Sequence, residues 1–206
     1  MASQEKSVIK DEVIAFKRRR ILEEAMVLFY ESGYRESSLD NLAERLNVTK
    51  PFIYSYFPGK GEILYEICKP SVELTLRAAI EVVESEDKPT EKLRKLVSRF
   101  VVIVCENRES IALFQRNHKS LLPEHNEKIM TSRKKFDMIL ESILSAGKEA
   151  GEFDIRDVRI ASLAISGMVN WTHTWYNPDG SMTPFQLGDR LADLAFATAR
   201  AKPMTL

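Results

Sequence analysis

Hydrophobic residues recur mostly three and four positions apart along this chain of 206 residues, and that spacing limits its fold more than any other feature. It places apolar side chains on one face of an α-helix, because the helix completes a turn every 3.6 residues. Only 8 Gly and 8 Pro punctuate the pattern, and hydrophobic residues make up 44% of the chain, enough to bury a core. We therefore expect an all-α protein with about nine helices.

The charge balance restricts how such a chain can meet a partner. Thirty Lys and Arg residues against 30 Asp and Glu residues give a net charge of zero. A chain with this balance does not coat nucleic acid indiscriminately, so any DNA-binding site must be local. The polar start lacks the hydrophobic segment of a secretory signal, and no run approaches the roughly 18 apolar residues of a membrane span. We expect a soluble, cytoplasmic protein without a membrane partner.

The residues that most often carry chemistry are sparse. Cys68 and Cys105 lie in hydrophobic helical stretches without the spacing of metal ligands, so we interpret them as buried, reduced core residues. His118, His125 and His173 have no Cys, carboxylate or second His three or four residues away. No nucleophile elbow and no phosphate-binding glycine loop is present. We therefore expect no catalytic residue, no metal, no cofactor and no enzymatic activity.

The first third of the chain predicts three helices in close succession. Residues 1–12 are polar and are expected to form a frayed arm, and a helix follows from Ile14 until Gly33 ends it as a left-handed cap. Ser38 can cap a second, short helix that ends at Asn47, the non-glycine type best suited to a left-handed turn. Thr49 can cap a third, with Pro51 in its first turn.

This succession is typical of a helix-turn-helix, in which a longer helix braces two short ones and the second short helix enters the major groove of DNA. In the third helix Ile53 and Phe57 can face the core, which turns five side chains outward: Lys50, Pro51, Phe52, Ser55 and Tyr56. Lys50 can bind guanine or phosphate, Phe52 can cover a thymine methyl group, and tyrosine hydroxyls suit phosphate oxygens.

Basic residues flank this motif. A cluster at residues 17–20, which includes Arg18 and Arg19, opens the first helix, and Lys60 opens the fourth. The alternative interpretation is a solvated basic face on a helical scaffold that binds protein, because helix-turn-helix motifs also occur without DNA binding.

A family resemblance favours DNA. The chain resembles the TetR family at Ala25-x-x-x-Phe29, Gly33-Tyr34, Ser38-Leu39, Leu42-Ala43, Val48-Thr49-Lys50, Ile53-Tyr54, Tyr56-Phe57, Lys60 and Glu62-Ile63-Leu64. The resemblance covers residues 14–65 and implies a homodimer with one reading helix for each operator half-site. It also implies a DNA-binding domain at residues 1–65 and a helical ligand-binding and dimerisation domain at residues 66–206.

The resemblance assigns roles by position. It implies phosphate contacts at Ser38, Thr49, Tyr54, Tyr56 and Lys60, and base contacts at Lys50, Pro51, Phe52 and Ser55. The chain departs from the family at Asn47, where glycine is usual, and at Asn41, where an acidic residue usually completes the capping box. Phe52 stands where a small or hydroxylated residue is frequent, so the operator sequence cannot be borrowed from relatives.

Residues 167–180 are the part of the second half that points to a ligand. They place aromatic and polar residues at a helix end before Pro178 and Gly180 break it, and they resemble TetR-type regulators of fatty-acid, steroid and related acyl-CoA degradation. This resemblance implies a small hydrophobic effector such as an acyl-CoA. The predicted ligand-binding residues are Phe100, Phe114, Asn170, Trp171, Thr174 and Trp175. The alternative is that these aromatic residues are ordinary core.

The last two predicted helices offer small and apolar faces that suit a four-helix dimer seam or, alternatively, an intramolecular core. Their residues are Ala161, Ala164, Ile165, Met168, Leu187, Leu191, Leu194 and Ala195. Taken together, these features predict a transcriptional repressor that a small molecule releases from operator DNA. An activator with the same DNA-binding motif is the second alternative.

Overall fold

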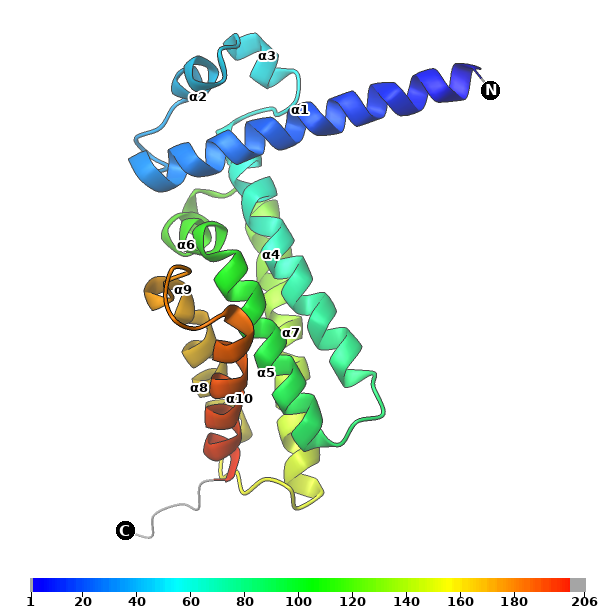
Figure 1. The fold of residues 1–206 in the computed structure, drawn as a ribbon, viewed down its shortest axis with the longest axis vertical. Helices are drawn as coiled ribbons and strands as arrows, with labels where there is room; N and C mark the ends of the chain where they lie inside the picture. Colours follow the sequence, from blue (N-terminus) through cyan, green and yellow to red (C-terminus); the bar gives the residue numbers. More distant parts are fainter. Residues whose placement is uncertain (1, 201–206) are drawn as a thin grey trace. The chain divides into compact units, whose positions relative to one another are not determined.

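The computed structural model describes residues 2–200, and the side chains of residues 9–200. The described residues form helices and loops without a strand, which confirms the all-α prediction. The helices are α1 (Ala2–Ser32), α2 (Leu39–Leu46), α3 (Lys50–Tyr54), α4 (Lys60–Val83), α5 (Pro89–Glu106), α6 (Arg108–Asn117), α7 (Pro123–Glu149), α8 (Val158–Asn170), α9 (Thr172–Trp175) and α10 (Pro184–Arg200), with a 3-10 turn at His118–Ser120 (Figure 1). One more helix occurs than expected because Trp171 separates the single turn α9 from α8.

The chain packs as two compact units. Unit 1 consists of Met1–Cys68 and Ala112–Asn126, and unit 2 consists of Lys69–Ile111 and Glu127–Leu206. Helices α4, α6 and α7 each contribute residues to both units, so the chain passes from one unit to the other inside helices. None of the described helices is long and apolar enough to cross a membrane.

Unit 1 is built around the three N-terminal helices. Its core contains the predicted apolar faces, with Ile21, Ala25, Phe29, Leu42, Ile53 and Phe57 all buried. Helix α1 begins at Ala2, so the expected frayed arm was wrong for residues 2–12. That stretch contains neither Gly nor Pro, and an established helix propagates through such a sequence at little cost. Met1 lies outside the described residues.

The turn between α2 and α3 depends on Asn47. Its backbone is left-handed, with φ 53° and ψ 46°, and its N–H donates to the carbonyls of Ala43 and Glu44. We expect Asn47→Gly to leave the free energy of unfolding within about 1 kcal/mol of wild type, because glycine adopts this conformation freely. Asn47→Val should lose about 1–2 kcal/mol more than Asn47→Gly. Urea unfolding at one protein concentration checks this, and equal midpoints for the two variants would contradict it.

Unit 2 is a helical bundle in which α10 lies along α5 and α8 (Figure 1). Its core includes Leu96, Phe100, Leu140, Ile165 and Ala195, all buried. At the crossing of α10 and α5, a Cβ atom on Gly188 would lie 2.9 Å from the carbonyl oxygen of Ser98. The two helices therefore approach more closely than any side chain at position 188 would permit.

Both cysteines are buried thiols, which confirms that part of the prediction. Burial raises the pKa of the Cys68 thiol to about 12, and it raises that of Cys105 from its ordinary value. At neutral pH both side chains therefore remain protonated and pack as small hydrophobic groups.

Candidate nucleic-acid interface

Two capped helix N-termini stand close together in the chain at the start of α2 and α3. The Ser38 hydroxyl accepts a hydrogen bond from the Asn41 N–H at 3.1 Å, and the Asn41 side-chain oxygen accepts one from the Ser38 N–H at 2.9 Å. Asparagine thus completes the capping box in place of the usual acid. Thr49 caps α3 by accepting from the Phe52 N–H at 3.4 Å, as predicted. Exposed N–H groups at such ends suit phosphate oxygens.

Helix α3 ends at Tyr54, three residues before the expected core position Phe57, although the N–H groups of residues 55–57 continue to donate to α3 carbonyls. Pro58 disfavours helical backbone at Phe57, the residue before it, so the helix does not continue through that position. Ile53 and Phe57 are fully buried, as predicted. The opposite side of the segment is accessible: Pro51, Tyr54 and Ser55 are exposed, and Lys50, Phe52 and Tyr56 are partly exposed.

The aromatic residues on this accessible side contact one another. The rings of Phe52 and Tyr56 lie 5.1 Å apart between centroids, and the Lys17 ammonium lies 5.7 Å from the centre of the Phe52 ring. The Ser55 hydroxyl donates to the Phe52 carbonyl at 2.7 Å. These contacts hold Phe52 and Tyr56 in place on the surface, so that two rings are available to bases or sugars without further ordering.

Lys50 forms an ion pair that sequence analysis did not anticipate. Its ammonium lies 2.8 Å from a carboxylate oxygen of Asp40, a residue in the first turn of α2. The hydrogen bond to Asp40 raises the pKa of Lys50 above its ordinary value. Asp40 is therefore a candidate interface residue. Asp40 and Lys50 are ten residues apart in the sequence. The local sequence therefore signals only an acidic residue two positions after the Ser38 cap, and does not signal its pairing with Lys50.

Arg18 and Arg19 differ in their surroundings. Arg18 donates to the Tyr56 carbonyl at 2.5 Å, and its guanidinium lies 4.2 Å from the centre of the Phe57 ring. Arg18, on α1, thus stabilises the segment that follows α3. In the predicted DNA contact, the same guanidinium would bind DNA and Tyr56 together. Arg19 is 66% exposed with Glu23 at 3.7 Å, which leaves it more accessible to a phosphate.

Lys60 is also held by unit 1. Its ammonium donates to the carbonyls of Tyr34 at 2.6 Å and Ser37 at 2.7 Å, and burial lowers its pKa from the ordinary value. An ammonium has three N–H donors, so one remains for the predicted phosphate contact. Lys60 therefore fastens the loop before α2 to the start of α4, a structural role that the sequence pattern did not predict.

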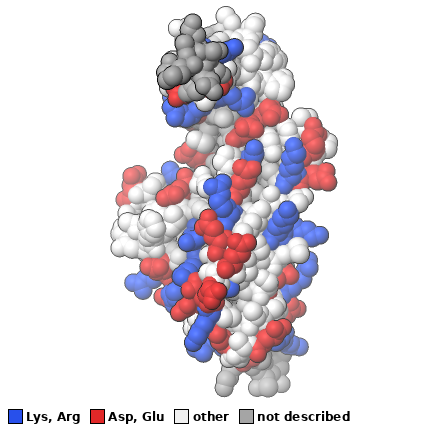
Figure 2. Space-filling view, turned by 90° about the vertical axis from the view of Figure 1, so that its right-hand side faces the viewer, with Lys and Arg blue, Asp and Glu red and all other residues white. Residues whose placement is uncertain are grey.

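A groove of about 640 Å³ runs beside this surface, between the first half of α1 and the end of α3. Its lining combines apolar and basic residues: Ile9, Lys10, Val13, Ile14, Lys17, Arg18, Ser55 and Tyr56. On the face shown in Figure 2, acidic and basic side chains are interspersed. The excess of basic residues is therefore local, as the zero net charge requires.

The predicted ligand-binding residues occupy different kinds of environment. Phe100 is buried in the core of unit 2, with its ring 4.7 Å from that of Phe136, and Phe114 is buried in unit 1. Trp171 and Trp175 are 63% and 49% exposed. The polar pair is locally satisfied: Asn170 donates to the Ser166 carbonyl and Thr174 to the Trp171 carbonyl. The ligand contacts of these residues remain a prediction.

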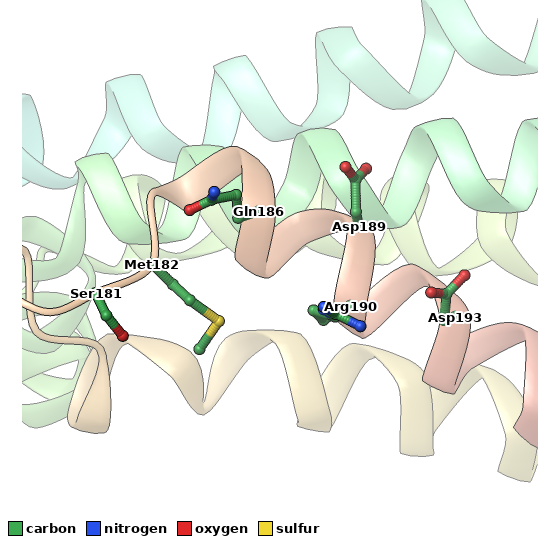
Figure 3. A pocket seen from close by; sticks show the side chains of 6 residues that line it. All are labelled: Ser181, Met182, Gln186, Asp189, Arg190 and Asp193. Atoms are coloured by element: carbon green, nitrogen blue, oxygen red, sulfur yellow. The ribbon is translucent and has the colours of Figure 1, made fainter.

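A cavity of about 360 Å³ in unit 2 involves other residues. It lies where the loop before α10 meets that helix and is lined by Ser181, Met182, Gln186, Asp189, Arg190 and Asp193 (Figure 3). Met182 and Ser181 point to the side of α8, whereas Gln186 and Asp189 point away from it. The mainly polar and charged lining does not match a hydrophobic effector.

Comparison with known protein families identifies the chain. Residues 21–67 match the model of bacterial regulatory proteins of the tetR family, and residues 86–199 match the tetracyclin repressor-like C-terminal domain. The chain belongs to the TetR family. It is accordingly a DNA-binding regulator of transcription, and TetR regulators bind operator DNA as dimers.

Individual TetR relatives match over most of their length. The crystal structure of the TetR family regulator PfmR from Thermus thermophilus is 35% identical, with a TM-score of 0.79 over 86% of this chain and 97% of that one. AibR, crystallised with isovaleryl coenzyme A and operator DNA, is 26% identical, with a TM-score of 0.75 over 87% of this chain and 97% of that one. The fatty acid metabolism regulator protein of Bacillus subtilis strain 168 is 26% identical over 86% of this chain and 93% of its own.

Proposed function

We propose that this TetR regulator is a repressor whose dimer reads a near-palindromic operator and is released by a small hydrophobic acyl compound. The observation that best supports this proposal is the accessible side of α3 and the residues that follow it. Lys50, Phe52 and Tyr56 are partly exposed there, and the helix begins at a capped N-terminus. Ile53 and Phe57 are buried and hold the segment against unit 1. A dimer would place two such helices about one DNA turn apart, roughly 34 Å. Residues 1–65 would bind DNA, residues 66–206 would bind the effector and the partner, and the protein would act in the cytoplasm without catalysis.

The dimer face that best fits the structure differs from the predicted seam. Five of the proposed residues are buried within their own protomer and cannot meet a partner: Ala161, Ile165, Leu187, Leu191 and Ala195. A different stripe of α8 is accessible, with Ile160 61% and Leu163 53% exposed and with the small residues Ala164 and Gly167 between them and Trp171. Spacings of three, four and seven residues put this stripe on one face of the helix.

Helix α10 extends this face. Leu194 is 54% exposed and lies five residues after Asp189, which is about 140° further around the helix. Small residues on α8 permit a second helix to approach closely, and the flanking Leu and Trp side chains supply apolar area. We assign Ile160, Leu163, Ala164, Gly167, Trp171 and Leu194 to the dimer face.

An acyl-CoA is the effector class that the comparisons support best. AibR binds isovaleryl coenzyme A and operator DNA in one crystal, and the Bacillus subtilis relative is named for fatty acid metabolism. Unit 2 has a hydrophobic core in which Phe100 and Phe136 are in contact, and an acyl chain would enter by displacing or reorienting such side chains. Release then requires the effector to bind one state of the protein more tightly than the DNA-binding state.

Residues 112–126 offer a route for this coupling, because they follow α5 in the chain yet pack in unit 1. The His125 ring stacks on the Tyr65 ring of α4 with centroids 3.9 Å apart and 8° between the planes. Its Nε2 atom lies 3.5 Å from a Glu62 carboxylate oxygen, and Arg116 lies over the Tyr30 ring of α1. A shift of this segment would therefore move α4 and α1, which hold the reading helix.

Replacing His125 by alanine tests this route. We expect operator affinity to stay within about threefold of wild type while the acyl-CoA concentration for half-release rises about 2- to 30-fold, the range of a coupling contact. Fluorescence anisotropy of labelled operator measures both quantities. His118→Ala is the matched control, since this histidine lies in the same segment and is partly exposed. Equal release curves for His125→Ala and wild type would contradict the route.

The function itself is tested by selecting genomic DNA fragments with the purified dimer at moderate salt and sequencing those retained. We expect enrichment of near-palindromes that overlap promoters, since a repressor blocks transcription there. Retention no better than for random fragments would contradict specific DNA reading. Enrichment only upstream of promoters, with transcription rising in the presence of the protein, would favour an activator.

A further inference from the structure

The ion pair between Asp40 and Lys50 joins the two helices of the motif at their exposed ends. Lys50 is the first residue of α3, and Asp40 lies in the first turn of α2. The side chain of Asp40 is 67% exposed and that of Lys50 is 42% exposed, and 2.8 Å separates the ammonium from the nearer carboxylate oxygen. An exposed pair of this kind contributes little to stability, typically up to about 1 kcal/mol. Stability alone therefore does not account for a carboxylate at this place.

The carboxylate is not needed as a helix cap either. Ser38 and Asn41 already satisfy the first turn of α2 through the reciprocal capping box. Asp40 consequently keeps its acceptor capacity for Lys50 and for any donor beside it. At a surface that approaches DNA, the phosphates repel a carboxylate, which weakens binding. A hydrogen bond from a base to the carboxylate offsets this repulsion at one position of the sequence.

A G·C base pair offers that hydrogen bond together with a partner for Lys50. In the major groove guanine presents two acceptors, O6 and N7, and cytosine presents one N4–H donor. Lysine donates to the guanine acceptors and aspartate accepts from cytosine N4. An A·T pair places its donor between two acceptors and adds a methyl group at the edge, so it matches the pair less well.

We propose that Asp40 and Lys50 act as one reading unit that selects a G·C base pair in each operator half-site, with Asp40 accepting from cytosine and Lys50 donating to guanine. This inference rests on the proposed function, in that α3 enters the major groove. Asp40 lowers affinity for every other sequence by adding a negative charge, and it thereby sharpens discrimination at one position.

The test measures binding of Asp40→Asn, Lys50→Ala and the double variant to the selected operator and to operators changed one base pair at a time. For wild type we expect one G·C position per half-site whose replacement by A·T weakens binding about tenfold to a hundredfold. Asp40→Asn should reduce that preference to about threefold or less and bind random DNA more tightly. Lys50→Ala should lose preference at the same position, and the double variant should lose little more.

Glu44→Gln is the matched control, because it removes one charge from another exposed position of α2. It should keep the wild-type preference. Retention of the preference in Asp40→Asn, or loss at different base pairs in the two single variants, would overturn the reading unit and leave only a surface ion pair. Failure of the wild type to select any operator would instead contradict the proposed function, so the two failures are distinguishable.

Discussion

Replacing Leu163 by aspartate is expected to convert the dimer to a monomer and to weaken operator binding about a hundredfold or more, because two linked half-site contacts become independent. Leu163 is 53% exposed in the middle of the accessible stripe of α8. A carboxylate there would have to be buried against a second apolar helix without a partner, which costs several kcal/mol. Leu194→Asp on α10 should act in the same direction.

Analytical ultracentrifugation and operator titration measure the two consequences together. Met138→Asp is the matched control, since Met138 is 59% exposed on α7 outside the assigned dimer face. It should stay dimeric with wild-type affinity. A dimeric Leu163→Asp protein with unchanged operator affinity would place the dimer face elsewhere.

Replacing Gly188 by valine should destabilise unit 2 severely, with little folded protein recovered. A Cβ at this position would lie 2.9 Å from the Ser98 carbonyl oxygen and 3.2 Å from the Ser98 Cα, both backbone atoms that cannot rotate away. Relief would require α10 to move off α5, which opens the core around Leu96, Leu187 and Ala195. Overpacking of this kind costs about 1–3 kcal/mol for one methyl group and more for larger side chains.

Gly188→Ala tests the same contact through the direction of the change in stability. Alanine favours a helix interior by about 1 kcal/mol over glycine, so intrinsic propensity alone predicts stabilisation. The close approach predicts a loss of about 1–3 kcal/mol instead. Gly61→Ala is the control, because nothing lies within 4 Å of its added Cβ, and it should not lower stability. Thermal unfolding at one protein concentration distinguishes the two predictions. An unfolding midpoint for Gly188→Ala above that of wild type would contradict the close contact.

The features that the sequence predicted correctly are those with local causes. Ser38 and Thr49 cap helices through atoms three residues away, and Asn47 adopts the left-handed backbone that its side chain tolerates. Ile53 and Phe57 are buried because their spacing of four matches the helix period. Each of these signals lies within a few residues of its effect, so a single sequence is enough to identify it.

The features that were missed depend on distant parts of the chain. Asp40 and Lys50 meet only because the turn at Asn47 brings α2 and α3 together, and Lys60 reaches carbonyls more than twenty residues away. The exposure of Trp171, which is 63%, likewise depends on which parts of the chain pack beside it. Periodicity indicates that a helix face is apolar but not which neighbour covers it, and this is why the sequence leaves a dimer seam and an intramolecular core as alternatives for the same residues.

The central claim, release of a repressor by an acyl compound, is tested most directly by titrating acyl-CoAs of increasing chain length into a preformed complex of the dimer with fluorescent operator. The account predicts that an acyl-CoA releases the operator completely, that free coenzyme A does not, and that the half-release concentration varies with chain length. An operator complex that persists under acyl-CoA concentrations shown by calorimetry to saturate the protein, or one that forms only when acyl-CoA is present, would contradict it.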